Sequence, residues 1–410
     1  MKDRIRVVIT GIGALTPLGL TVLDFWKGLV EGRCGIGAIT LFDTSNFAIK
    51  VAAEVKGFKP ENYMEVKRVD RTSRCIQFGI AASRLAMESA ALEMRKEKSE
   101  RVGVTIATSG QISLIVDNAD TINNKPNRVD PLLINKIAAS MVPCQIGLEL
   151  GARGPNTSIN SACASGSDAI GTALNHLLLG RADVMIAGGA DSNVNPLAIA
   201  ATARVGALSK EPDPFKACRP FDLNRNGFVY GEGAGICILE TLEHARNRGA
   251  EILAELAGAG WSYDAYNDVA PDPDMEATAM RMAIQDAQIT PEAIDYINAH
   301  GTSTKLNDAS ETKAIKMVFG QRAYTIPVSS NKSMVGHIAC AAGAVEAVAS
   351  IMTIKEGIIP PTINYETPDP ECDLDYVPNK ARKQQVNACL SNSFGMGGQN
   401  CCIVIKKFIE

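Results

Sequence analysis

The sequence is poor in histidine and aromatic residues, and it lacks several patterns that mark particular classes of protein. Of its 410 residues, four are His and 5% are aromatic. No run of basic residues interleaved with aromatic ones is present, and the formal net charge is -4, which argues against nucleic-acid binding. No apolar stretch is long enough to span a bilayer, and residues 1–6 have no signal-peptide core. We therefore expect a cytoplasmic protein that binds neither nucleic acid nor membranes.

Cysteine is not scarce, but its arrangement excludes two common uses. The count of 11 is odd and the spacing is irregular, and several cysteines lie in apolar runs, namely Cys237, Cys389, Cys401 and Cys402. This usage is typical of reduced core thiols rather than of disulfides. No Cys-x-x-Cys pair is present, so we expect no structural zinc site.

Apolar strand-like runs alternate with helical stretches along the whole chain, which predicts an α/β architecture with buried sheets. A first strand over residues 6–10 precedes a glycine-rich loop, Gly11-Ile12-Gly13. Thr290-Pro291-Glu292 is typical of a helix start, and a small-residue helix is expected over residues 337–355. The length and 46% apolar content suffice for two or three cores. We place two similar α/β halves at residues 1–250 and 251–410.

Cys163 carries the strongest chemical signal. It lies in Asn160-Ser161-Ala162-Cys163-Ala164-Ser165-Gly166-Ser167, which opens a long apolar helix. A helix N-terminus lowers the pKa of a thiol, and its free N–H groups can bind an oxyanion. The small neighbours would let a substrate chain reach the sulfur. The alternative is an ordinary core cysteine, and the histidines decide against it.

Two of the four histidines lie at positions where ligand-binding groups collect. His300 follows a predicted strand in Asn298-Ala299-His300-Gly301-Thr302, and His337 follows another at the expected start of a helix. An imidazole at a helix N-terminus tends to stay neutral, and it can then donate a hydrogen bond to a carbonyl gaining negative charge. His176 and His244 lie within helices, where a structural role is expected.

These motifs together resemble the β-ketoacyl-acyl-carrier-protein synthases of the elongating type, close to the synthase II group of the thiolase superfamily. The resemblance spans the chain, through Pro220-Phe221-Asp222 and Gly231-Glu232-Gly233-Ala234-Gly235 to Asn392-Ser393-Phe394-Gly395-Met396-Gly397-Gly398. It implies a five-layered αβαβα fold from two similar halves, the first carrying the nucleophile and the second both catalytic histidines. It also implies an acyltransferase of fatty acid elongation, which joins malonyl-carrier protein to a Cys-bound acyl chain by decarboxylative Claisen condensation.

The resemblance assigns roles to individual residues. Cys163 would carry the acyl chain, His300 and His337 would hold the malonyl thioester oxygen, and Lys332 would order the histidines. The remaining assignments are an oxyanion hole and gate at Cys163, Met396 and Phe394; substrate contacts at Thr302, Thr304 and Gln111; and supporting acids at Asp308, Glu311 and Glu346. Asp308 and Glu311 also match a helix N-cap with its capping-box glutamate. Asn298, Glu346 and Asn392 match a monovalent-cation site of some relatives, and no other metal is implied.

Three positions depart from the usual family pattern and leave the substrate open. Met396 stands where the second phenylalanine of Gly-Phe-Gly-Gly is usual, Lys305 replaces a proline, and Gln111 replaces an apolar residue. Lys305 is shared with catalytic ketosynthase subunits of aromatic polyketide systems. The alternative function is therefore the ketosynthase subunit of a type II polyketide or polyene synthase.

The implied partner is acyl carrier protein, whose phosphopantetheine arm delivers the substrates, so no separate cofactor is expected. Because the carrier is acidic, docking should use a local basic patch. The candidates are Lys67, Arg68, Arg71, Arg74 and Arg204, with Lys210 near Arg204. A homodimer is expected, or a heterodimer with a chain-length partner subunit.

Two other motifs do not indicate ligand sites. Gly11-Ile12-Gly13 lacks the third glycine of a dinucleotide-binding motif, so NAD binding is not expected. A calcium-binding loop that started at Asp222 would need a glutamate at position 233, where the chain has Gly233, so calcium binding is not expected.

Overall fold

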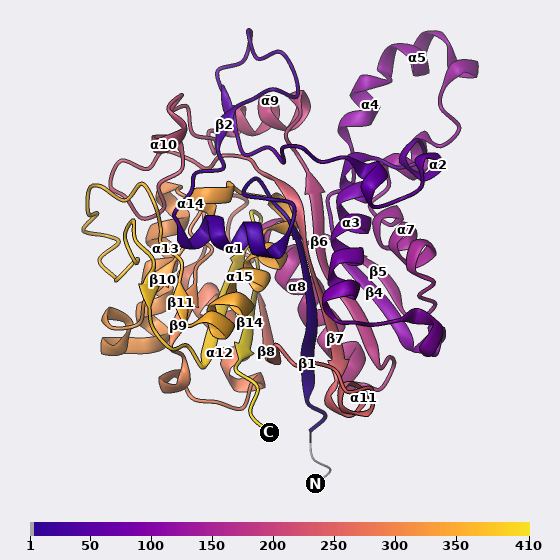
Figure 1. The fold of residues 1–410 in the computed structure, drawn as a ribbon. Coiled ribbons are helices and arrows are strands. Elements are labelled where there is room, and N and C mark those ends of the chain that lie inside the picture. Colours follow the sequence, from indigo (N-terminus) through magenta and orange to yellow (C-terminus); the bar gives the residue numbers. More distant parts are fainter. Residues whose placement is uncertain (1–3) are drawn as a thin grey trace.

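The computed structural model describes residues 4–410 and contains a ten-stranded sheet made of two five-stranded sets (Figure 1). The first set contains β1 (Val7–Leu15), β4 (Val102–Ala107), β5 (Asn156–Ile159), β6 (Val184–Ser192) and β7 (Glu232–Thr241). The second contains β8 (Ala254–Tyr263), β9 (Tyr296–Asn298), β10 (Val328–Ser329), β13 (Ala388–Phe394) and β14 (Gln399–Lys406). The prediction that residues 1–6 contain no signal-peptide core falls partly on residues 1–3, which lie outside the described residues.

The two sets repeat one topology. The strands lie in the order β10-β9-β13-β14-β8-β1-β7-β6-β4-β5. Within each set, the strands can be numbered from first to fifth in chain order. From the outer edge of the sheet toward the junction, both sets then have the order third, second, fourth, fifth, first. The sets join where β1 meets β8 through two residue pairs, Val8 with Glu255 and Ile9 with Ala254. The predicted α/β architecture of two similar halves is confirmed.

Helices form three layers around the two sets of strands. The helix α3 (Arg74–Ser89) covers β1, β6 and β7 on one outer side, and α12 (Pro273–Asp286) covers β8 and β14 on the other, with α13 (Lys305–Phe319) beside it. Between them, α8 (Ser165–Leu178) and α15 (Ala342–Glu356) pack on each other and touch strands of both sets. The result is an αβαβα arrangement in which α8 and α15, the helices that follow Cys163 and His337, share the middle layer.

The middle layer forms because both of its helices are apolar. In α8, Ile170, Leu174 and Leu177 recur at helical spacing and belong to one core cluster with Val348 of α15. All residues of α15 from Ala342 to Ile354 are buried. At Gly343 an added Cβ would lie 2.7 Å from the backbone nitrogen of Ser167, so only glycine permits this approach of the two helices.

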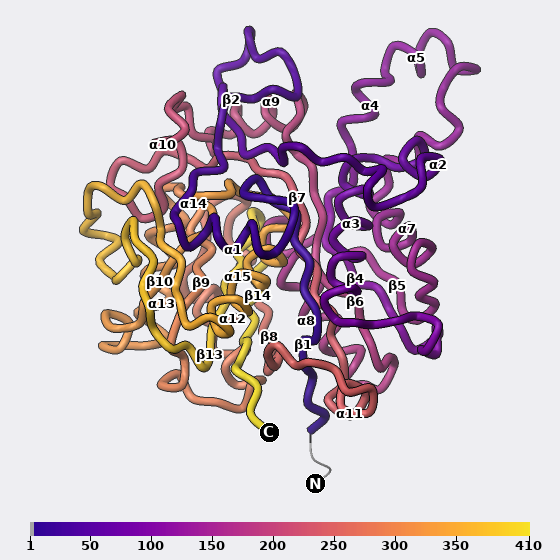
Figure 2. Tube along the Cα trace, viewed as in Figure 1, coloured from indigo at the N-terminus to yellow at the C-terminus, as the bar shows by residue number. Residues whose placement is uncertain are grey.

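The remaining elements are shorter and lie mainly around the edges (Figure 2). They are α1 (Val22–Val30), α2 (Val66–Val69), α4 (Ser113–Asp117), α5 (Ala119–Asn124), α6 (Leu133–Ile137), α7 (Met141–Leu150), α9 (Pro196–Val205), α10 (Pro214–Ala217), α11 (Leu242–Asn247), α14 (Lys332–Val335) and the strand pairs β2 (Gly37–Ala38) with β3 (Val51–Ala52) and β11 (Ile358–Ile359) with β12 (Arg382–Lys383). The α4–α5 lobe projects from the body of the molecule. Between residues 4 and 410, no helix has the length and apolar character needed to cross a membrane.

Two local predictions were wrong. Gly11 and Gly13 do not form a loop but lie inside β1. A Cβ on Gly13 would lie 2.1 Å from the carbonyl oxygen of Ala82, so these glycines let α3 pack directly on the strand. Thr290-Pro291-Glu292 does not open an α-helix, because the turn at Pro291–Ala293 has only three residues and gives way to β9.

Candidate active site

Cys163 lies in a tight turn just before α8 rather than within that helix. The turn is a 3₁₀ segment, Ala162–Ala164, and Ala162 has a φ of 50°, a left-handed conformation that is unfavourable for a residue with a Cβ. The Ser161 N–H donates to Ser165 Oγ at 2.8 Å, which closes the turn against the start of α8. This strained turn places half-buried Cys163 in the wall of a cavity.

The predicted depression of the thiol pKa is wrong. Burial raises the pKa of Cys163, and the Met396 N–H and the charge of Lys332 offset this only in part. The backbone N–H of Cys163 itself also acts on the sulfur. The two N–H groups expected to form the oxyanion hole therefore both lower the thiol pKa, although their role in catalysis stays a prediction.

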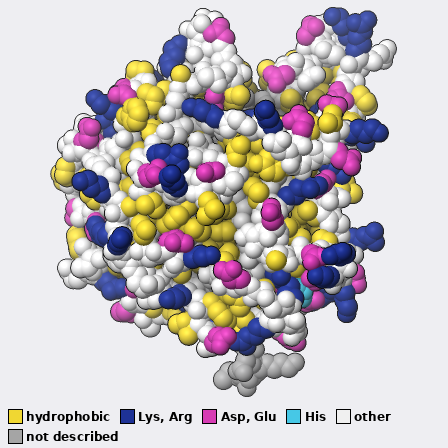
Figure 3. Space-filling view, viewed as in Figure 1, with side chains coloured by type: hydrophobic (Ala, Val, Ile, Leu, Met, Phe, Trp, Pro, Cys, Tyr) yellow, Lys and Arg dark blue, Asp and Glu magenta, His cyan; other side chains and the backbone are white. Residues whose placement is uncertain are grey.

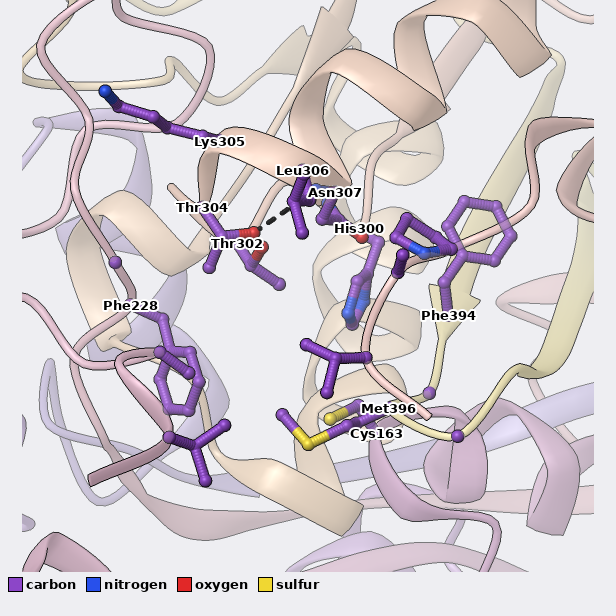
Figure 4. A pocket seen from close by; sticks show the side chains of 18 of the residues that line it. Cys163, Phe228, His300, Thr302, Thr304, Lys305, Leu306, Asn307, Phe394 and Met396 are labelled. Carbon is purple, nitrogen blue, oxygen red and sulfur yellow. Dashed lines mark hydrogen bonds between the residues drawn. The ribbon is translucent and has the colours of Figure 1, made fainter. Parts of the chain in front are cut away.

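The sulfur and two imidazoles meet in one pocket, as predicted. The Sγ atom of Cys163 and one ring nitrogen each of His300 and His337 all lie within 4.8 Å of one another. Figure 4 shows Cys163 and His300 in this pocket. The two rings are 5.5 Å apart between centroids and nearly perpendicular, at 85°. Each ring can therefore direct a nitrogen toward a group attached to the sulfur.

His337 is neutral for a different reason from the one expected. It does not begin a helix: its N–H donates to Val229 O at 2.7 Å, and α15 starts only at Ala342. Burial lowers the pKa of His337 well below its usual value, and the charge of Lys332 lowers it further. The pKa of His300 is also far below normal, through burial, Lys332 and His337 in that order. Both rings can therefore donate hydrogen bonds as neutral imidazoles.

Lys332 lies beside both histidines and is almost fully buried. Its Nζ donates to His300 O at 2.6 Å, lies 3.4 Å from His300 Nδ1, and forms an ion pair with Glu346 of α15. Because one ammonium group contacts both the backbone and the ring of His300, it restricts where that ring can move.

The two acids of α13 fix the loop that carries His300 and do not cap the helix. The N-cap is Thr304, whose hydroxyl accepts from the Asn307 N–H at 3.4 Å. Glu311 accepts from the His300 and Gly301 N–H groups, each at 2.8 Å. Burial raises its pKa to about 7, against the lowering effect of these hydrogen bonds. The capping interpretation is therefore wrong, and Glu311 positions His300.

Asp308 supports a neighbouring turn. Its Oδ2 accepts from the Phe221 N–H at 2.8 Å and the Ser303 N–H at 3.1 Å. Arg225, which follows Asp222 in the segment that resembles the start of a calcium loop, lies 3.6 Å from this carboxylate, and its side chain is only 2% exposed. This segment therefore has a structural use that its sequence did not reveal.

A cavity of about 380 Å³ leads from Cys163 to the protein surface. Thr302 and Thr304 line it, and their hydroxyls are hydrogen-bonded to each other at 2.8 Å. Phe228, which the sequence did not single out, also lines it and packs edge-on against His337, with ring centroids 5.1 Å apart. Within the described chain Gln111 is not part of this lining; its amide donates to Ser192 O at 3.2 Å.

The gate region lies against the sulfur. Phe394 and Met396 line the same cavity as Cys163, and Figure 4 shows the Met396 side chain beside the cysteine. The ring of Phe394 lies 5.9 Å from that of His300. Met396 is 44% exposed, so this unbranched side chain has room to move at the position predicted for the gate.

The proposed cation ligands do not all have free oxygens. The amide of Asn392 donates to Glu311 at 3.0 Å, and its oxygen accepts from Cys402 Sγ at 3.3 Å. Asn298 Oδ1 accepts from Asn331 Nδ2 at 3.1 Å. Among residues 4–410, Glu346 Oε2 and Asn331 Oδ1 are buried without a hydrogen-bond partner, which suits a cation ligand. A cation here stays a prediction, with Asn331 as a better candidate than Asn392.

Two of the candidate docking residues already form ion pairs within the chain, and the others are exposed to solvent. Arg74 pairs with buried Glu232 at 2.5 Å, and Arg68 pairs with Glu149 at 2.6 Å, so neither is freely available. Lys67, Arg71, Arg204 and Lys210 are exposed. A hollow of about 340 Å³ is lined by Lys67, Arg68 and Arg71 together with Leu132 and Leu148. On the face in Figure 3 basic and acidic side chains are mixed, so any basic surface there is local.

Comparison with known proteins identifies the family. The chain matches the N-terminal domain of beta-ketoacyl synthase over residues 4–245 and the C-terminal domain over residues 253–366. The chain belongs to the beta-ketoacyl synthase family. The 3-oxoacyl-[acyl-carrier-protein] synthase 2 of Synechocystis sp. is 46% identical and covers 99% of both chains. The protein of the same name from Coxiella burnetii is 43% identical over 100% of both.

Solved structures agree on the fold of this beta-ketoacyl synthase. The ishigamide ketosynthase/chain length factor has a TM-score of 0.93 and 37% identity, covering 99% of this chain and 100% of that one. A type II polyketide ketosynthase, solved with its acyl-carrier protein and bound to the hexaketide, has a TM-score of 0.91 and 35% identity with the same coverage. The resemblance found in the sequence and its thiolase-like fold are confirmed.

The Cys163, His300 and His337 donors are also of the kind that bind zinc. In a beta-ketoacyl synthase, however, the same sulfur must be free to form a thioester. The three residues are therefore better suited to acyl transfer than to metal binding.

Proposed function

We propose that this chain is a 3-oxoacyl-acyl-carrier-protein synthase, which lengthens a Cys163-bound acyl chain by two carbons from malonyl-carrier protein. The observation that carries this proposal is the convergence of one sulfur and two neutral imidazoles at the inner end of a cavity open to solvent. The reaction needs no cofactor beyond the phosphopantetheine arm of the carrier.

In the first half-reaction, the Cys163 sulfur attacks the thioester carbonyl of acyl-carrier protein. The acyl–sulfur bond to the carrier breaks, the carrier thiol leaves, and the acyl group stays on Cys163. The N–H groups of Cys163 and Met396 are positioned to hold the oxyanion, and removing one such donor typically costs about 2.7–4 kcal/mol. Because the thiol pKa is raised, the sulfur must lose its proton as it attacks. An imidazole close to the sulfur accepts this proton and passes it to the departing carrier thiolate, so that both rings are neutral again.

In the second half-reaction, malonyl-carrier protein occupies the vacated cavity. Its carboxylate leaves as carbon dioxide, and the electron pair forms an enolate whose oxygen gains negative charge. His300 and His337, held neutral by burial and Lys332, donate hydrogen bonds to that oxygen. The enolate carbon then attacks the acyl carbonyl, the Cys163 thiolate leaves, and a 3-oxoacyl-carrier protein results.

The carrier protein would dock through the exposed basic residues, with Lys67, Arg71 and Arg204 as the best candidates. A related ketosynthase has been solved with its acyl-carrier protein, which supports a carrier as the partner here. Since the chain has a net charge of -4, docking must depend on such a local patch and should weaken as salt increases.

We further propose that two copies of the chain pair along β5. This strand is the outer edge of the sheet and bonds only to β4 among the described strands, so one side of its backbone is free. The segment that contains α4, α5 and α6 exposes apolar side chains, including Ile112 at 55% and Ile134 at 72%. A second copy would cover both features. Multi-angle light scattering showing a monomer at micromolar concentration would contradict this assembly.

The ketosynthase subunit of a polyketide or polyene system is the second candidate. The similarity to the ishigamide and hexaketide-bound ketosynthases favours it, as does Lys305. Condensation of simple saturated acyl chains by the isolated protein supports fatty acid elongation. Failure with these chains, together with activity only when a second subunit is added, supports the alternative.

The central test is mass spectrometry of Cys163 after incubation with a panel of acyl-carrier proteins. We expect the acyl mass on the peptide containing Cys163 and its loss in Cys163→Ala. Cys75 and Cys340 are buried cysteines that should remain unlabelled. Labelling of another residue, or of none, would contradict the proposed mechanism.

A further inference from the structure

The outer end of the catalytic cavity contains a lysine that the mechanism does not use. Lys305 lines this cavity, and Figure 4 shows it at the opposite end of the view from Cys163 and Met396. Its side chain is exposed, and its ammonium group points away from His300. A ligand that reaches the sulfur through this cavity must therefore pass Lys305.

Among the described residues that line the cavity, Lys305 alone has a permanently charged side chain. The rest of the lining consists of the catalytic cysteine and histidines, neutral polar groups and apolar groups, with no aspartate or glutamate. Among the described residues Lys305 forms no ion pair; the nearby carboxylate of Asp369 is held by Arg225 at 2.5 Å. The mouth of the cavity thus carries a positive charge that is not held in an ion pair within residues 4–410.

The stability of its own helix does not explain this lysine. Lys305 is the first residue of α13, where the helix dipole disfavours a cation. The side chain is also too exposed to contribute to the core. Both observations fit a residue whose charge is used by a ligand.

The substrate arm has its charge in the matching place. A phosphopantetheine arm carries its thioester at one end and its phosphate at the other. With the thioester at Cys163, the amide groups lie along Thr302 and Thr304, and the phosphate lies toward solvent. We propose that Lys305 binds the phosphate of the phosphopantetheine arm and so selects phosphorylated over unphosphorylated pantetheine thioesters. This inference rests on the proposed function, because it takes the arm of a carrier protein as the ligand.

Two probes that differ only in the phosphate test it. Malonyl-pantetheine and malonyl-4′-phosphopantetheine are compared by kcat/KM for carbon dioxide release. We expect the wild-type protein to prefer the phosphorylated probe about fivefold, the size of an exposed ion pair. In Lys305→Ala this preference should disappear, mainly through KM, and Lys305→Arg should restore it. The preference should also decline with added salt.

Lys313→Ala is the matched control, since Lys313 is an exposed lysine on the same helix. It should keep the wild-type preference. An equal preference in wild type and Lys305→Ala, or no preference in wild type, would overturn the inference.

A binding measurement separates this inference from the proposed function. Calorimetry with 4′-phosphopantetheine, which has no malonyl group, needs no catalysis. Tighter binding to the wild-type protein than to Lys305→Ala would support the phosphate contact, even if the protein released no carbon dioxide. In that case the absence of carbon dioxide release would contradict only the synthase assignment. Equal binding to both proteins would overturn the role of Lys305.

Discussion

Lys332 and Glu346 form an ion pair in the protein interior, with only 1% and 3% of their side chains exposed. A buried ion pair is rarely a source of stability, because desolvation offsets the attraction. This pair lies against His300, whose carbonyl oxygen accepts from Lys332 Nζ at 2.6 Å. Its position therefore indicates that it orders the histidine pair and keeps both rings neutral.

This relationship predicts that stability and activity respond differently to removal of the pair. Lys332→Met leaves Glu346 as a buried charge without its partner and should lower the free energy of unfolding by about 3–5 kcal/mol. The double variant Lys332→Met/Glu346→Leu should recover most of that loss, but not malonyl decarboxylation. Urea denaturation and carbon dioxide release measure the two effects. A double variant with wild-type decarboxylation would show that the pair is only structural.

A second prediction separates the two half-reactions. His337→Ala should reduce malonyl decarboxylation by about a hundredfold to a thousandfold, as expected for loss of one oxyanion donor. It should still accept an acyl group on Cys163. Cys163→Ala should keep malonyl decarboxylation but should not accept an acyl group, since carbon dioxide loss does not involve the sulfur. Circular dichroism is the control for folding, and decarboxylation by His337→Ala at the wild-type rate would contradict the role of that ring.

Local signals predicted that His300 and His337 each follow a strand, whereas their convergence with Cys163 was predicted from the family resemblance. His300 and His337 both follow strands, and β9 and β10 are parallel neighbours, so the residues after them emerge at the same edge. The alternation of apolar runs likewise gave the α/β class. Pairing between distant strands, such as β1 with β8, has no comparable local signal.

Two of the wrong predictions, the glycine loop and the low thiol pKa, share one cause, which is that burial comes from tertiary packing. A glycine pair such as Gly11 and Gly13 is compatible with a loop or with a strand on which a helix packs closely. The sequence around the pair does not reveal that α3 packs on this strand. The thiol pKa of Cys163 depends more on desolvation than on the helix that follows. Phe228 was missed because a single aromatic residue carries no motif.

The raised pKa of Cys163 predicts how its reactivity changes with pH. Because burial raises the pKa, the thiolate fraction should still increase through pH 9. The rate of iodoacetamide alkylation at Cys163 should therefore rise about tenfold per pH unit from 7 to 9 without a plateau. Lys332→Met should slow alkylation further at each pH, since the lysine charge lowers the pKa. A plateau below pH 8 would instead support a depressed thiol pKa.

A buried carboxylate far from the cavity gives a prediction about stability. Glu240 of β7 is fully buried and accepts hydrogen bonds from Arg248 Nη2 and His244 Nδ1, each at 2.5 Å, and from Thr10. Burial alone would raise its pKa, but the hydrogen bonds from Arg248, His244 and Thr10 outweigh burial and lower it to about 2. The pKa of His244 is raised, chiefly by its hydrogen bond to Glu240.

The sign of these shifts sets the pH range in which the cluster stabilises the fold. The depressed pKa of Glu240 gives stability that is present above its unfolded value, near 4.5, and lost as pH falls toward 2. The raised pKa of His244 gives stability that is present below about 6.5 and lost as pH rises through the folded value. Glu240→Gln should therefore lower the free energy of unfolding most, by about 3 kcal/mol, near pH 5.5. Urea denaturation at pH 3, 5.5 and 9 measures this, with Glu243→Gln on exposed Glu243 as the control. An equal loss at all three pH values would show that the cluster acts through packing rather than through charge.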